Sequence, residues 1–67
     1  MTKKDYVRLA AAIKDARADI RGKEAPEHQE ELLDGTSYAA DFLADALAND
    51  NPLFNRARFL AACGVTQ

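Results

Sequence analysis

The chain has 67 residues, a hydrophobic fraction of 48% and a formal net charge of −2. This length allows one domain, and so short a chain buries only about 60% of the surface that its unfolded form exposes. A second copy or a permanent partner would supplement so small a core. The mildly acidic total argues against a strong overall attraction to nucleic acid or anionic membranes, which leaves only local basic patches for such contacts.

Charge is divided along the chain. Residues 24–50 contain eight carboxylates and no Lys or Arg, whereas residues 1–23 carry seven Lys and Arg against three Asp. The two parts can pair with each other, or they can present an acidic and a basic surface to partners. Blocks of like charge are most often solvated faces, so this division does not by itself identify a site.

The first helix is predicted over residues 3–21. Thr2 followed by Asp5 resembles a capping box, and Gly22 after a cationic last turn predicts the end of the helix. Side chains alternately three and four positions apart lie on one side of a helix, which identifies the core face. These core-facing residues are Tyr6, Leu9, Ile13, Ala16 and Ile20.

A second line of mostly small residues lies on another side of this helix: Val7, Ala11 and Ala18, with Lys14 among them. Small side chains allow either a third element or a second subunit to approach closely. We expect a homodimer with Val7, Ala11 and Ala18 near its two-fold axis, because a symmetric dimer buries one patch against its own copy.

The second helix is predicted over residues 26–49 and begins with Pro26, whose missing N–H has no helical partner in a first turn. Its core-facing residues are Leu32, Thr36, Ala39, Leu43 and Ala46, widened by Leu33, Ala40 and Leu47. Gly35 costs about 1 kcal/mol relative to alanine inside a helix. It is compatible with a kink, a break recapped by Thr36 or Ser37, or a close approach of another backbone, and we expect a continuous helix.

The opposite side of the second helix carries carboxylates around two aromatic rings. We call this surface the acidic–aromatic face, and it consists of Glu27, Glu31, Asp34, Tyr38, Asp41, Phe42 and Asp45. Aromatic side chains are enriched at the centres of protein interfaces. The acidic–aromatic face is therefore the predicted partner-binding surface.

A short third helix is predicted over residues 56–63. Pro52 ends the preceding helix, because the residue before a proline is disfavoured in the helical conformation. Asn55 is the expected N-cap, and Phe54 and Phe59 are placed as a hydrophobic staple. Phe59, Leu60 and Cys63 form the inward edge, and Gly64 is the expected stop.

These elements predict an all-α fold in which an antiparallel two-helix hairpin is closed by a short third C-terminal helix. Residues 1–67 form a single small helical domain, which we expect to be dimeric. Cys63 lies at the end of an apolar run and is expected to be a small buried hydrophobe rather than a reactive thiol.

The segment from Ala44 to Gly64, together with the opening Lys3-Lys4-Asp5-Tyr6, resembles a group of short uncharacterised bacteriophage and prophage proteins. Their shared ending is of the form L-A-x-x-N-P-x-F-x-x-x-R-F-L-x-A-C-G, and it covers about a third of this chain. Asn55 stands where Asp is expected, a substitution that keeps the cap. The resemblance implies a phage-encoded intracellular protein and implies no activity.

Catalytic, metal-binding and cofactor-binding signatures are not found in the sequence. Its one histidine, His28, lies near the start of an acidic helix and is expected to be exposed, and Cys63 is the only cysteine. Exposed carboxylates on a helix lack the cleft that acid–base catalysis needs. We therefore expect no catalysis, no metal and no cofactor. Because no apolar signal region or membrane-spanning stretch is present, we expect the protein in the cytoplasm of a bacterial host cell.

Three functions from different classes remain beside a purely structural role. The favoured one is a protein-interaction module that binds and modulates a host protein through the acidic–aromatic face. The second is a helix-turn-helix-like DNA-binding regulator, because two arginines at a helix start suit base reading. Its contact residues would be Lys3, Lys4, Arg8, Arg56 and Arg58. The third is an acidic mimic of nucleic acid, in which the carboxylate line imitates phosphates.

Overall fold

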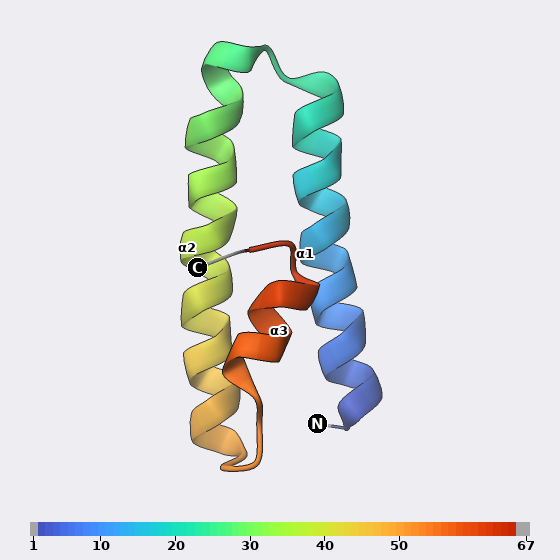
Figure 1. The fold of residues 1–67 in the computed structure, drawn as a ribbon, viewed down its shortest axis with the longest axis vertical. Coiled ribbons are helices and arrows are strands. Elements are labelled where there is room, and N and C mark those ends of the chain that lie inside the picture. The colour runs from blue at the N-terminus through green and yellow to red at the C-terminus, as the bar shows by residue number, and fades with distance from the viewer. Residues whose placement is uncertain (1, 66–67) are drawn as a thin grey trace.

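Three helices make up the part of the chain that the computed structural model describes, residues 2–65. They are α1 (Lys3–Lys23), α2 (Pro26–Asp50) and α3 (Arg56–Ala62). The first two form an antiparallel hairpin, and α3 packs across both of them in the half of the hairpin away from the α1–α2 turn (Figure 1). The all-α class and the hairpin closed by a short third helix are confirmed.

The N-termini of α1 and α3 are capped by the residues that the sequence predicted. The backbone N–H of Thr2 donates to Asp5 Oδ2 at 2.9 Å, which closes the capping box of α1 and lowers the pKa of the Asp5 carboxyl. At α3, Asn55 Oδ1 accepts from the backbone N–H of Arg58 at 3.0 Å. Each cap satisfies a backbone donor that has no partner within the first turn of the helix.

The end of α3 is fixed by Gly64, which has a φ of +81°. This left-handed conformation lets the Val65 N–H donate to the Leu60 carbonyl at 2.9 Å, while the Gly64 N–H donates to the Ala61 carbonyl at 3.0 Å. The pair of bonds is a Schellman motif, in which Val65 and Leu60 are expected to touch. Both side chains are buried, so the motif packs Val65, just after α3, against the core.

The turn between α1 and α2 corrects one prediction. Gly22 does not end α1; the helix continues to Lys23, and the N–H of Glu24 still donates to the Ile20 carbonyl at 3.0 Å. The Gln29 side-chain amide reaches back from α2 to the carbonyls of Arg21 at 3.3 Å and Glu24 at 2.9 Å. The Gln29 side chain therefore supplies hydrogen bonds to carbonyl groups at the end of α1, the role that the glycine was expected to play through its backbone conformation.

The core is an alanine-lined junction of the three helices, and its phase differs from the prediction by about one position. Of the predicted core residues of α2, Ala40 and Leu47 are buried, whereas Ala39 and Ala46 are exposed and Leu32 is 42% exposed. Ala44, which was not predicted, is fully buried. The reason is α3, which packs against α2 as well as α1 and draws the buried side of α2 toward itself. The remaining buried residues are Ala10, Leu47, Phe59, Leu60, Cys63 and Val65, besides Arg17.

Arg17 occupies the place on α1 that the sequence assigned to its exposed neighbour Ala16. Its side chain is only 7% exposed. The two N–H groups of one guanidinium nitrogen, Nη1, are shared among three acceptors: the Leu33 carbonyl at 3.0 Å and the hydroxyls of Thr36 at 2.7 Å and Ser37 at 2.9 Å. Arg17 thus links α1 to α2 through polar contacts to three residues of α2.

Gly35 lies inside an uninterrupted α2, so the expectation of a continuous helix is confirmed. A Cβ atom added there would meet nothing within 4 Å, which rules out a close backbone approach as its role. We expect Gly35→Ala to stabilise the fold by about 0.5–1 kcal/mol, because alanine loses less backbone entropy in a helix. Thermal unfolding followed by circular dichroism measures the gain as a higher Tm.

Gly64→Ala is the matched control for that substitution. The same added methyl group there forces an alanine into a left-handed conformation, which costs stability. Because the two substitutions are expected to change stability in opposite directions, the comparison separates helix propensity from a general effect of the methyl group. A lower Tm for Gly35→Ala would contradict the account of α2.

Candidate functional site

Two aromatic rings stand exposed on the acidic–aromatic face of α2. Tyr38 is 68% exposed and Phe42 is 61% exposed. They lie one helical turn apart, with ring centroids separated by 5.0 Å and planes inclined by 49°. Glu27, Glu31 and Asp34 are exposed on the same face. The arrangement is a small apolar platform bordered by negative charge, on the side of α2 that does not contribute to the core.

Part of the predicted carboxylate line is already engaged within the chain. Arg56 on α3 pairs through Nε with Asp45 Oδ1 at 2.8 Å and through Nη2 with Asp41 Oδ1 at 3.2 Å. The bond to Asp45 raises the pKa of the Arg56 guanidinium. Asp41 and Asp45 therefore orient α3 against α2, and the carboxylates not committed to Arg56 are those nearer the α1–α2 turn.

Of the basic residues predicted for DNA contact, the structure brings Lys3 and Arg58 to one groove and pairs Arg56 with carboxylates. Arg56 is held by two carboxylates, and α3, which it begins, has only seven residues. Lys4 and Arg8 are exposed on α1, whereas Lys3 and Arg58 border a groove between α1 and α3. A helix-turn-helix reading would need Arg56 free at the start of its recognition helix. One of the two predicted base-reading cations, Arg56, is therefore paired within the chain.

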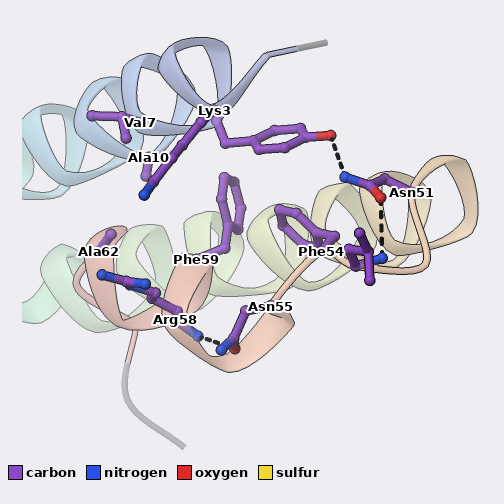
Figure 2. Close-up of a pocket in the computed structure, with 11 residues that line it drawn as sticks. Lys3, Val7, Ala10, Asn51, Phe54, Asn55, Arg58, Phe59 and Ala62 are labelled. Carbon is purple, nitrogen blue, oxygen red and sulfur yellow. Dashed lines mark hydrogen bonds between the residues drawn. The ribbon is translucent and has the colours of Figure 1, made fainter.

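A groove of about 410 Å³ lies between α1 and α3. Figure 2 shows its floor, where the Phe59 ring points toward α1 between the two helices and Phe54 lies beside it. Tyr6 completes the floor with an edge-on contact to Phe54 at a centroid distance of 4.9 Å. Val7 and Leu53, which are 60% and 91% exposed, form apolar edges. The sequence pattern did not predict this groove.

The signal that points to the groove was present in the turn after α2. Leu53 is a large apolar residue in a polar turn, and Asn51 fixes its position: the Asn51 Oδ1 accepts from the Leu53 N–H at 3.0 Å. The Asn51 amide nitrogen donates to the Tyr6 hydroxyl at 3.4 Å, which ties the turn to α1. The pattern Asn-Pro-Leu in a polar turn thus indicates more than a helix stop: it also indicates a leucine side chain held at the surface by the turn.

The predicted dimer residues Val7, Ala11 and Ala18 are all exposed on α1. Val7 also borders the groove, and Lys14, on the same side of the helix, lies against the end of α3, with its Cγ 3.9 Å from the place where a Gly64 Cβ would be. The third helix therefore borders this line, and Ala11 and Ala18 remain open to a second subunit.

Cys63 is fully buried, and burial raises the pKa of its thiol. Because the folded state favours the protonated thiol, stability should decrease as the pH rises above the ordinary thiol range of about 8.5. We expect iodoacetamide to modify Cys63 slowly in the native protein and rapidly in urea, as mass spectrometry would record. Rapid modification of the native protein at neutral pH would show that the thiol is accessible.

Within residues 2–65, no three His, Cys, Asp or Glu side chains are grouped so that they hold a metal ion. No helix of this range has the length and apolar character that crossing a bilayer requires. His28 is exposed near the start of α2, as expected.

No protein-family model matches the chain, and neither a curated protein nor a solved structure is detectably similar to it.

Proposed function

We propose that this chain is a small phage-type protein-interaction module that binds a host protein through the acidic–aromatic face of α2 and modulates that protein without catalysis. The observation that carries the proposal is the pair of exposed rings, Tyr38 and Phe42, which contact each other one turn apart on a helix whose other side forms the core. Aromatic anchors supply much of the energy of protein interfaces. The phage origin rests on the resemblance of the Ala44–Gly64 segment.

The charge around the rings defines the chemistry of the partner. Exposed Glu27, Glu31 and Asp34 favour a host protein that surrounds an apolar pocket with Lys or Arg. Such complementary charge accelerates encounter and fixes orientation, while the two rings supply the buried contact. The association should therefore weaken in high salt, although the apolar part of the contact persists.

The test is capture of a partner from bacterial lysate by tagged protein, with wild type compared with Tyr38→Ala/Phe42→Ala. Truncating a central aromatic anchor costs at least about 2 kcal/mol, roughly a thirtyfold loss of affinity. We expect wild type to retain one stoichiometric host protein that the double variant loses. Leu32→Ala, which trims another exposed side chain of α2 off this face, is the matched control and should retain the partner.

Three results would overturn the proposal. Equal capture by wild type and the double variant would place the partner elsewhere on the surface. Recovery of DNA alone would support the DNA-binding regulator. Capture of a DNA-binding protein that Glu31→Gln/Asp34→Asn loses but Tyr38→Ala/Phe42→Ala retains would support the nucleic-acid mimic, because only charge would then be recognised.

The dimer that we propose for this module places Ala11 in a seam with Val7 and Ala18. Ala11 is exposed in the single chain, so Ala11→Glu leaves the core intact while setting two like charges against each other in the dimer. Light scattering should report a dimer for wild type at micromolar concentration and a folded monomer for Ala11→Glu. A wild-type protein that is monomeric at high micromolar concentration would refute the seam.

A further inference from the structure

The α1–α3 groove has a preformed apolar floor. Tyr6 contacts Phe54 edge-on at 4.9 Å, and Phe54 in turn contacts Phe59 at 5.5 Å between centroids. Asn51 holds this cluster in place, because its Oδ1 accepts from the Leu53 N–H in the turn and its amide nitrogen donates to the Tyr6 hydroxyl. A binding site whose side chains are already ordered loses little conformational entropy when a ligand enters. The groove is therefore built to receive apolar side chains without rearrangement.

The charge at this groove is opposite in sign to that of the acidic–aromatic face. Lys3 from α1 and Arg58 from α3 extend on either side of it (Figure 2). Neither takes part in an ion pair among residues 2–65, and no carboxylate lines the groove, although the chain as a whole is acidic. Two free cations that flank an apolar floor favour a ligand that combines carboxylates with bulky apolar groups.

We propose that the α1–α3 groove is a second docking site, which binds an acidic amphipathic segment of a partner protein. The groove holds the one or two apolar anchors of that segment above Phe59, while Lys3 and Arg58 pair with carboxylates next to them. Its volume of about 410 Å³ suits such anchors rather than a whole helix. Leu53, which is 91% exposed, would be covered by the apolar side of the segment, whereas bare phosphates would leave it in water.

This site is independent of the acidic–aromatic face. Asn51 is the one residue of the described chain that borders the groove close to α2, and it lies just past the end of that helix. Tyr38 and Phe42 do not line the groove. A module with two surfaces of opposite charge can hold two partners at once, so the groove goes beyond the function proposed above and can be tested without it.

The direct test is fluorescence anisotropy with a labelled peptide that carries Leu and Phe one helical turn apart among glutamates. Two control peptides replace either the Leu and Phe with Ala or the glutamates with Lys. The first protein variant is Lys3→Glu/Arg58→Glu, which reverses the groove cations. Its matched control is Lys4→Glu/Arg8→Glu, which makes the same change in net charge on exposed residues outside the groove. Circular dichroism establishes that both variants remain helical.

We expect wild type and Lys4→Glu/Arg8→Glu to bind the acidic Leu/Phe peptide similarly, and Lys3→Glu/Arg58→Glu to bind it at least about tenfold more weakly. Both control peptides should bind at least about tenfold more weakly to wild type as well. Should a charge-reversed variant fail to fold, Lys3→Gln/Arg58→Gln gives the same comparison with a smaller perturbation and should still reduce binding.

Four outcomes would overturn the proposal. Equal weakening by the two charge-reversed variants would mean that only net charge matters. Undiminished binding of the Ala peptide would mean that the floor is not used. Displacement of the peptide by dodecanoate at lower concentration than by unlabelled peptide would assign the groove to a small amphipathic anion. Absence of peptide binding, with a wild-type dimer that Lys3→Glu/Arg58→Glu converts to monomer, would show that a second copy fills the groove.

Discussion

Phe59→Ala is expected to unfold most of the protein. The ring is 5% exposed, lies between α1 and α3 and contacts Phe54 in the hydrophobic staple that fixes the entry to α3. Removing a buried phenylalanine side chain costs about 3–5 kcal/mol, which is comparable to the whole stability of a domain this small. Circular dichroism at room temperature should report loss of most of the helical signal.

Phe42→Ala is the matched control, because it deletes the same atoms from a ring that is 61% exposed. It should keep the wild-type spectrum and nearly the wild-type Tm, since surface substitutions usually change stability by less than about 0.5 kcal/mol. If Phe59→Ala remained as helical as Phe42→Ala, the staple would not be the contact that closes the hairpin.

Arg17→Ala is expected to destabilise the fold by about 2–3 kcal/mol. The substitution removes charge-assisted hydrogen bonds to the Leu33 carbonyl and to the Thr36 and Ser37 hydroxyls, each of which spans α1 and α2. It also removes the buried aliphatic stem of the arginine. Urea unfolding measures the change: a lower midpoint concentration with an unchanged m-value reports a loss of stability.

Arg17→Met separates these two contributions because it keeps a stem and removes the guanidinium. Arg17 Nε is buried without a hydrogen-bond partner among the described residues, so its removal relieves one cost. The Thr36 and Ser37 hydroxyls still donate to the Leu33 carbonyl at 2.7 and 3.1 Å, so that acceptor keeps its partners. We expect a loss of only about 1 kcal/mol. A loss as large as that of Arg17→Ala would mean that the hydrogen bonds, not the stem, dominate.

Helix boundaries were predictable because they depend on local chemistry. The predicted ranges 3–21, 26–49 and 56–63 differ from the observed helices by at most two residues at any end. Asn55 and Gly64 act through backbone hydrogen bonds within a few residues, so their sequence context is sufficient. Gly22 was misread because Gln29, from the next helix, satisfies the end of α1.

The rotation of each helix was less predictable. On α1 the predicted series through Leu9 and Ala16 and the series through Ala10 and Arg17 have the same alternating spacing, and hydrophobicity favours the first. The structure uses both series: Ala10 is 2% exposed, and Tyr6, Leu9 and Ile13 of the predicted series are partly buried and pack against the same core cluster. The polar pair Thr36 and Ser37 on α2 was the signal that a polar side chain would face it.

The candidate site was predicted in part. The exposure of Tyr38 and Phe42 follows from the position of the carboxylates around them, since the helix cannot bury both sides. The engagement of Asp41 and Asp45 by Arg56 depends on where α3 docks, and nothing local specifies it. The groove likewise exists only after Leu53 and Phe54 are placed beside α1, far from them in sequence.

The most direct test of the central claim is an NMR titration of isotopically labelled protein with the host protein recovered by capture. We expect amide shifts to concentrate on the exposed face of α2, around Glu31, Asp34, Tyr38 and Phe42, and Tyr38→Ala/Phe42→Ala to abolish them. Shifts confined to other surfaces, or a titration that the double variant leaves unchanged, would contradict the assignment of the acidic–aromatic face as the partner-binding surface.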